Sequence, residues 1–214
     1  MEKIYHVEML TQTLGERVGP MALETMIAAN LKQDSILGLV GHNEYHFDSN
    51  AFDASDAYME AQRQIALRVL RDKREIILAR QAFGRLTHAA QDFYAHSNYV
   101  YLWREQFNGT DVMPAPSQVA AMDEVLLSHL ELHSGKIYFG EALIYILPFL
   151  TPWVFPRLPE DSHAKMNLDY PERGDMFPYA IAAASQRTIY EFELLGERVT
   201  AELGDGAWEK FRSG

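Results

Sequence analysis

Three polar side chains with helical spacing are the strongest indication of chemistry in this sequence. His88, Asp92 and His96 follow one another at intervals of four residues in the string LTHAAQDFYAHSN. Residues four apart share one face of an α-helix, so these side chains would form a single stripe. Imidazole and carboxylate groups are common zinc ligands. The stripe therefore predicts a metal site; the alternative is a helix with a polar, hydrogen-bonded face.

The length of this stripe indicates more than one ion. A rise of about 1.5 Å per residue separates His88 from His96 by about 12 Å along the axis and puts each about 6 Å from Asp92. An adjacent pair can hold one ion, but the two ends would struggle to share one. Because a carboxylate can bridge ions a few Å apart, we expect at least two metals with Asp92 between them.

Other histidines divide into candidate ligands and surface residues. His46 and Asp48, in the string EYHFDSNAF, are a second candidate pair, although an isolated pair in a loop also fits a local turn. His42 is either a ligand or a residue that supports one. His129 and His133 have ligand spacing, but we expect both to face water on a polar helix.

Composition sets limits on the chemistry. The chain has 214 residues, eight histidines and no cysteine, which excludes disulfides, thiolate zinc sites and thiol nucleophiles. Thirty acidic residues against nineteen basic ones give a formal charge of −11. This charge argues against sequence-independent binding to nucleic acid or to anionic lipid. Bound divalent ions would offset part of it.

The hydrophobic pattern predicts helices throughout. No segment alternates as a strand does and no repeat is present, so we expect an all-α fold in a single compact domain over residues 1–214. Long loops are expected at 37–55 and at an internal linker, 108–116. The expected helices are 7–18, 20–30, 57–72 after caps at Asp53, Ser55 and Asp56, 75–95, 118–133 and 177–203.

An apolar segment covers residues 137–156. Glu141 and three prolines argue against a membrane-spanning helix. The segment is either a short buried helix with a loop closing the core, or an aromatic surface that contacts a membrane peripherally or lines an acyl groove. The N-terminus lacks the apolar stretch of a secretory signal, which indicates a cytoplasmic protein or export by another route.

Two strings resemble a known family. LTHAAQDFYAHSNYV and EYHFDSNAF are similar to the Het-C-type family, including the related segment of animal proteins that contain a von Willebrand A domain. That family is similar, more distantly, to the zinc-dependent phospholipases C and single-strand-specific zinc nucleases. The weaker matches extend from His6 to about Glu193.

This resemblance implies a helical fold around two or three zinc ions and a set of site residues. Asp48 and Asp92 would be catalytic, and Asp169 is a further candidate ligand. The implied metal ligands are His6, His46, Asp48, His88, Asp92, His96 and His163.

The expected activity is zinc-dependent phosphodiester hydrolysis of the phospholipase C type, with phospholipids as substrates. Metal-assisted attack by water on a phosphodiester is the chemistry that such a cluster supplies. The alternatives are an incompatibility or toxin-type protein that binds a membrane or partner and holds a structural metal, and a zinc nuclease. A nuclease usually needs a basic track, which this acidic chain lacks.

Overall fold

The computed structural model describes residues 1–35, 38, 41–72, 75–108 and 113–214. Helices make up the regular structure of these residues, and no named strand occurs among them. Two isolated bridges, Ser97 to Ser134 and Lys136 to Ser162, join extended segments. The predicted all-α single domain is confirmed. The predicted linker 108–116 and loop 37–55 include positions 109–112, 37, 39 and 40, which lie outside the described residues.

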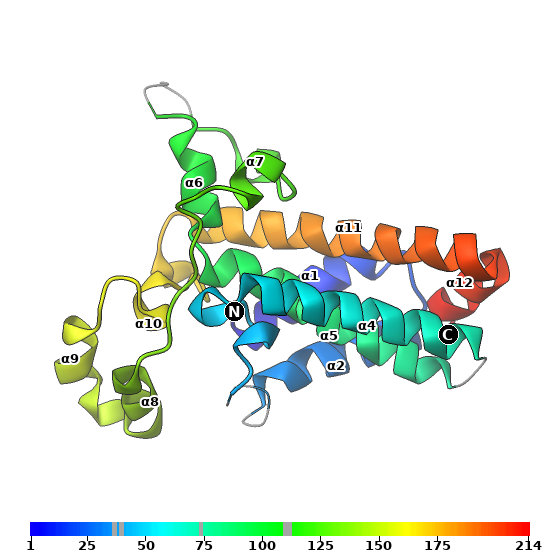
Figure 1. Cartoon of the computed structure of the whole chain (residues 1–214), viewed down its shortest axis with the longest axis horizontal. Coiled ribbons are helices and arrows are strands. Elements are labelled where there is room, and N and C mark those ends of the chain that lie inside the picture. The colour runs from blue at the N-terminus through cyan, green and yellow to red at the C-terminus, as the bar shows by residue number, and fades with distance from the viewer. Residues whose placement is uncertain (36–37, 39–40, 73–74, 109–112) are drawn as a thin grey trace.

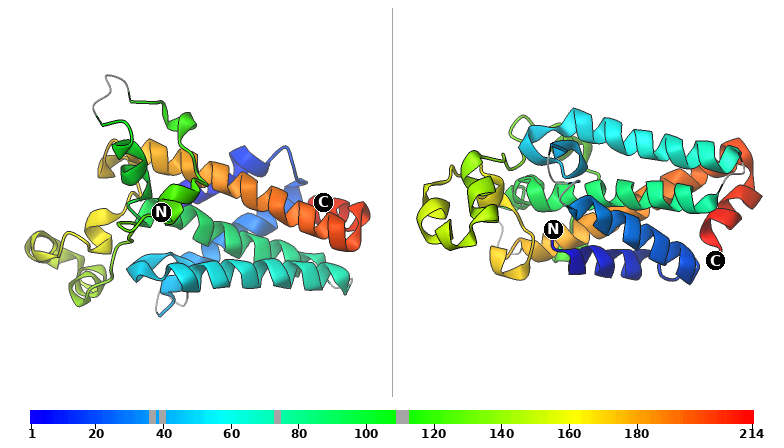
Figure 2. Two further views of the ribbon diagram at one scale, coloured as in Figure 1. Left: turned by 45° about the horizontal axis from the view of Figure 1, so that its top comes forward. Right: turned by 90° about the horizontal axis from the view of Figure 1, so that it is seen from below.

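Long helices form a bundle around α5. Figure 1 shows α5 running through the bundle beside α4, and it also packs against α2 and α11. Two further views show the same elongated arrangement (Figure 2). The long helices are α1 (Lys3–Leu14), α2 (Pro20–Leu31), α4 (Phe52–Arg71), α5 (Ile76–His96) and α11 (Phe177–Leu203).

The buried faces of α5 explain its central position. From Leu86 to His96 every residue of this helix is buried. Small residues let the neighbouring helices approach closely: a Cβ built on Gly84 would lie 2.2 Å from the carbonyl oxygen of Met26 in α2. The polar stripe of α5 therefore lies inside the bundle, where polar groups need partners.

Helix ends follow local sequence in some places and not in others. Pro20 and Pro178 occupy first-turn positions, and α11 stops at Gly204, which has a φ of 83°. The caps predicted at Asp53, Ser55 and Asp56 are wrong, because α4 begins earlier, at Phe52. Packing of Phe52 against Phe47 and Phe93 extends the helix back through those polar residues.

The predicted helix 118–133 is also wrong. Only η4 (Pro116–Gln118) and α7 (Glu124–Leu127) are helical there, and the rest is extended or turn. Backbone hydrogen bonds from Gly135 to His96 and from Asn98 to His133 hold this segment along the end of α5. Two short helices, α6 (Tyr99–Glu105) and α12 (Asp205–Arg212), were not predicted.

The apolar segment forms short elements that project from one end of the bundle (Figure 1). Phe139 is 85% exposed and Trp153 61% exposed, so the predicted buried helix that closes the core is wrong. Among the described residues, no helix combines the length and apolar character that crossing a bilayer requires. The elements are α8 (Phe139–Ile146), η5 (Pro148–Leu150), α9 (Thr151–Val154) and η6 (Phe155–Arg157), and the chain continues into α10 (His163–Met166) and η7 (Pro171–Arg173).

Candidate metal centre

Four parts of the chain bring the polar cluster together at one end of the bundle. Helix α5 contributes its C-terminal stripe, and α1 contributes His6 from its first turn. Three short 3₁₀ segments, η1 (Lys32–Asp34), η2 (Asn43–Tyr45) and η3 (Asp48–Asn50), carry or flank the loop ligands. Helix α10 adds His163 from the other side.

The first group of donors consists of Asp34, His46, His88 and Asp92. His46 Nδ1 lies 2.9 Å from Asp92 Oδ2, and His88 Nε2 lies 3.0 Å from the same oxygen. The two imidazole nitrogens are 3.1 Å apart, and Asp34 Oδ1 is 3.5 Å from His88 Nε2. Four donor atoms from three segments therefore converge on one point.

These separations fit a zinc ion. Zinc binds histidine nitrogen at about 2.0–2.1 Å in tetrahedral geometry, so neighbouring ligand atoms lie about 3.3 Å apart. The measured separations run from 2.9 to 3.5 Å. His46 Nε2 and Asp34 Oδ2 are buried, and neither has a hydrogen-bond partner within the described part of the chain. The atoms that face the donor group are His46 Nδ1 and Asp34 Oδ1, so the two orphaned atoms are the second polar atoms of these side chains.

Amide side chains orient the histidines of the first group. His88 Nδ1 donates to Asn30 Oδ1 across 3.3 Å, which leaves Nε2 free to act as a ligand. Asn30 also donates to Gln91 Oε1, which accepts from His6 Nδ1 at 2.7 Å. Gln91 in turn donates to Thr188 of α11. These hydrogen bonds of Asn30 and Gln91 thus fix the orientation of the His6 and His88 rings.

His6 belongs to the same cluster. Its ring stacks on that of His88 with centroids 4.5 Å apart, and its Nε2 lies 3.3 Å from Asp92 Oδ1. That nitrogen is buried and has no hydrogen-bond partner among the described residues. The His6 Nε2 atom is therefore available as a ligand beside Asp92 Oδ1, whereas the ring nitrogens of His46 and His88 lie beside Asp92 Oδ2.

The second group of donors consists of Asp48, His96 and His163. Asp48 Oδ1 lies 2.8 Å from His163 Nδ1 and 3.2 Å from His96 Nδ1. The His96 and His163 rings meet edge to face, with centroids 4.4 Å apart. The His163 side chain is 22% exposed, whereas those of His88 and Asp92 are fully buried. Only the second group thus has a histidine ligand that reaches solvent.

Positive charge already converges on the carboxylates. The Met1 ammonium is buried 2.8 Å from Asp92 Oδ1 and 3.0 Å from Asp169 Oδ1, and lies 3.2 Å from His96 Nε2. Burial opposes its charge, but the Asp169 and Asp92 carboxylates raise its pKa to about 11. Residues 92 and 169 thus form an acidic pair that favours cations.

The same balance keeps the carboxylates ionised. Burial disfavours the charged form of Asp92, but the Met1 ammonium and the histidines hold its pKa well below its ordinary value. His163 and His96 outweigh burial in the same way and lower the pKa of Asp48. Burial lowers the pKa of His88 to about 4, so its ring is neutral at pH 7, as a metal ligand must be.

All seven predicted ligands lie in this cluster, and the structure adds two residues to it. Asp34 completes the first group, and Asp169 lies 3.2 Å from His96 Nε2. Asp169 was expected only as a candidate ligand, and Asp34 was not among the expected ligands. A single aspartate after a helix cannot be recognised as a ligand from residue spacing, because its partners in the cluster are more than ten residues away.

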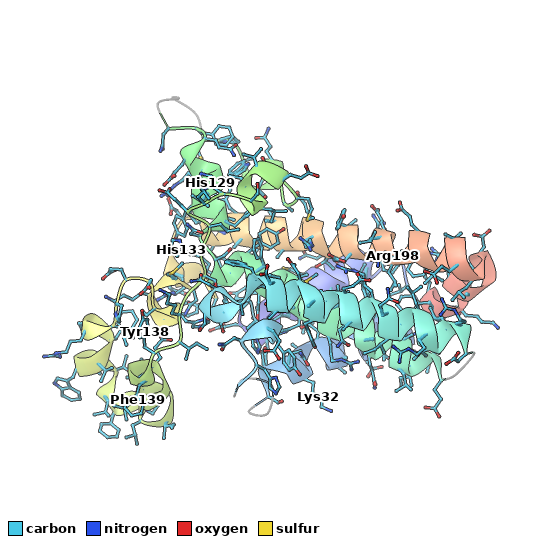
Figure 3. All side chains as sticks on the ribbon, in the orientation of Figure 1. Lys32, His129, His133, Tyr138, Phe139 and Arg198 are labelled. Atoms are coloured by element: carbon cyan, nitrogen blue, oxygen red, sulfur yellow. The ribbon has the colours of Figure 1, made fainter. Side chains whose placement is uncertain are left out.

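Four of the eight histidines lie outside both donor groups as searched over the described residues: His6, which contacts Asp92, and three histidines outside the cluster. His42 pairs with Glu44 at 2.9 Å and stacks on Tyr45. His129 and His133 are exposed, as expected, but they lie on a turn-rich segment instead of a helix. Figure 3 shows both on the segment near α6 and α7.

A family model decides the relationship of this chain to known proteins. The model for the VWA7 N-terminal domain matches residues 1–124, more than half of the chain. The chain belongs to the VWA7 N-terminal domain family. The match includes every residue of the first donor group together with Asp48 and His96, whereas His163 and Asp169 lie beyond it.

Two relatives give the scale of the similarity. Von Willebrand factor A domain-containing protein 7 of Rattus norvegicus is 35% identical over 88 residues, and the Mus musculus protein is 36% identical over 88 residues. Each alignment covers 40% of this chain and 9% of the relative. The chain therefore matches less than a tenth of these relatives' length. No solved structure matches the chain.

The family assignment corrects the one expected from the sequence strings. The identification as a Het-C-type protein related to zinc phospholipases C is wrong, because the matching family is that of the VWA7 N-terminal domain. This family gives no support to the labels hydrolase, phospholipase C, Het-C or toxin. Any function for this VWA7-type domain must be argued from the geometry of its donor groups.

Proposed function

We propose that the two donor groups bind two zinc ions and that the centre cleaves phosphodiesters. Their ligands are histidine nitrogens and carboxylate oxygens, a set that suits zinc. Ligand separations near those of a tetrahedral zinc site support binding at the first group. Three ionised, buried or nearly buried carboxylates supply the charge that the ions require.

The two groups differ in a way that indicates different roles. The first has four protein donors and is largely buried, which is typical of a closed structural site. Each group has one partly exposed donor, Asp34 in the first and His163 in the second, but the second group has only three donors, and three protein ligands with an open position are typical of a catalytic zinc site. This difference is the observation that carries the proposal.

The side chains around the second group would have different roles in hydrolysis. A zinc ion there would lower the pKa of water and offset charge on a phosphoryl oxygen. Asp48 Oδ1 lies 3.2 Å from His96 Nδ1 and 2.8 Å from His163 Nδ1, so these three side chains would hold the ion together. Asp169 is 21% exposed and stays ionised because the Met1 ammonium and His96 outweigh burial, so it would supply further negative charge beside the ion.

Metal analysis with matched variants tests this proposal. We expect about two zinc ions per wild-type chain, measured by mass spectrometry after dialysis. His88→Ala should lose the first ion and His163→Ala the second, while the control His129→Ala should keep both because its side chain is exposed. A wild-type protein that stays folded and binds no zinc would contradict the metal centre.

Activity separates the catalytic role from a structural one. We expect zinc-dependent hydrolysis of bis(4-nitrophenyl) phosphate that is lost in His163→Ala and kept in His129→Ala. The same assay with phosphatidylcholine and single-stranded DNA defines the substrate class. Two bound zinc ions with no hydrolysis of any phosphodiester would refute the enzymatic role and leave a structural one.

A further inference from the structure

The projecting apolar unit, residues 137–158, exposes several large apolar side chains. Phe139 is 85% exposed, Ile146 72%, Phe149 67% and Trp153 61%. These residues come from α8, η5 and α9, so three successive elements contribute to one tip. Exposed apolar residues concentrated in this way mark an interaction site, whereas single ones scattered over a surface do not.

The apolar unit packs mainly on itself. Helices α8 and α9 contact each other and the neighbouring η5 and η6. The unit projects from the bundle in both Figure 1 and Figure 2, and Phe139 lies near its lower edge in Figure 3. Prolines at 148, 152 and 156 break it into short helical elements, so its exposed apolar residues do not lie on one continuous helix face.

Charge in the apolar unit differs from that in the rest of the chain. Residues 136–158 contain two cations, Lys136 and Arg157, and one acid, Glu141. Glu141 is buried and Arg157 is exposed. The segment thus carries a net charge of +1 within a chain whose net charge is −11, and no exposed acid of residues 137–158 would repel a phosphate-bearing surface.

We propose that the apolar unit inserts into the interface of a zwitterionic lipid bilayer. Tryptophan and phenylalanine suit the headgroup level, and an exposed arginine at the base of the tip can pair with lipid phosphate. A stable protein interface needs a broad complementary face, whereas lipids adapt around a projecting tip. The acidic remainder of the chain opposes adhesion to strongly anionic membranes, so phosphatidylcholine is the expected partner.

The apolar unit is also tied to the second donor group. His163 N donates to the Lys136 carbonyl at 2.9 Å, and Ala164 N donates to Glu141 Oε2 at 3.2 Å. A Cβ built on Gly135 would lie 2.5 Å from the His163 Cα, so the two segments are in close contact. An inserted unit would hold the exposed histidine at the membrane surface. If the proposed hydrolysis holds, its substrate class is phospholipid.

Vesicle flotation tests the insertion directly. Full-length protein is mixed with unilamellar phosphatidylcholine vesicles, and the partition coefficient is measured in 0.1 M and 0.5 M NaCl. Removing one inserted aromatic side chain should weaken partitioning about 10-fold, so Phe149→Ser/Trp153→Ser should weaken it about 100-fold. The matched control is Val125→Ser/Leu130→Ser, whose positions are 71% and 101% exposed but lie outside the unit. We expect the control to bind like wild type, and salt to have little effect.

Each outcome supports or overturns the proposal. Wild-type protein that does not float, or an equal loss in the two double variants, would overturn it. Sedimentation that shows a wild-type dimer and a Phe149→Ser/Trp153→Ser monomer would assign the unit to a second copy and refute lipid insertion. His163→Ala should still float while losing hydrolysis, so failure of the metal centre and failure of insertion give different results. Thermal unfolding verifies that all variants are folded.

Discussion

Asp92→Asn tests how far the centre depends on one carboxylate. Asp92 is fully buried and lies within 3.3 Å of the Met1 ammonium and of three imidazole nitrogens, those of His6, His46 and His88. The amide has nearly the same shape but no charge. The substitution therefore leaves the ammonium and the cluster without their central counter-charge.

The expected loss is large even without metal. Removing one partner of a buried ion pair costs about 3–5 kcal/mol of the free energy of unfolding. In a protein of this size, 1 kcal/mol shifts Tm by about 2–4 °C, so Tm should fall by about 6–20 °C. Glu193→Gln breaks the exposed pair with Arg17 and is the control; it should cost no more than about 1 kcal/mol.

Calorimetry with and without zinc measures both parts of this effect. After chelation, Asp92→Asn should melt well below wild type. Zinc at about 100 times its Kd stabilises a protein by about 2.7 kcal/mol per site, so the two proposed sites should raise Tm of the wild type by about 11–22 °C. The variant should show a much smaller rise. Equal melting temperatures and an equal response to zinc in wild type and Asp92→Asn would refute the central role of this carboxylate.

Three further substitutions or conditions probe the surroundings of the centre. In metal-free protein, His88 should contribute a loss of about 3 kcal/mol in the free energy of unfolding between pH 7 and pH 4, because the unfolded chain protonates it near its ordinary pKa of 6.5 and the folded chain only near 4, whereas His96, whose folded pKa is raised, contributes in the opposite direction; urea titrations in which His88→Asn changes with pH as wild type does would contradict this. Gln91→Ala should weaken zinc binding about 10–100-fold, by isothermal titration, since it removes the hydrogen bonds that orient the rings; unchanged affinity would exclude this role. Gly84→Ala should destabilise the protein by about 1–3 kcal/mol because its Cβ would meet the Met26 carbonyl, whereas Gly206→Ala, with open space around it, should not.

Helical spacing explains why half of the centre was predictable from the sequence. His88, Asp92 and His96 lie on one face of α5 because residues four apart must, and the expectation of two metal positions agrees with two donor groups in the structure. Whether those groups hold ions stays a prediction. Asp34 had no such regularity, since it joins the cluster only through the packing of α2 against α5.

Tertiary contacts also explain the errors in the fold. Residues 118–133 have an apolar pattern that a helix would satisfy, but hydrogen bonds with the end of α5 hold the later part in an extended form. The exposed side chains of 137–156 could not be predicted, because an apolar sequence alone does not say whether a protein core or another surface covers it. The early start of α4 depends on Phe52 reaching an aromatic cluster that is distant in sequence.

The positions of the donors along the chain have a consequence for unfolding. The first group joins residues 34, 46, 88 and 92, and the second joins 48, 96 and 163. With ions bound as proposed, each group closes large loops and restricts the unfolded chain much as a disulfide does. A chain without cysteine would thereby gain cross-links that a reductant cannot break. The rate at which a protease cleaves the 41–50 loop should therefore depend on the zinc concentration and not on the redox state.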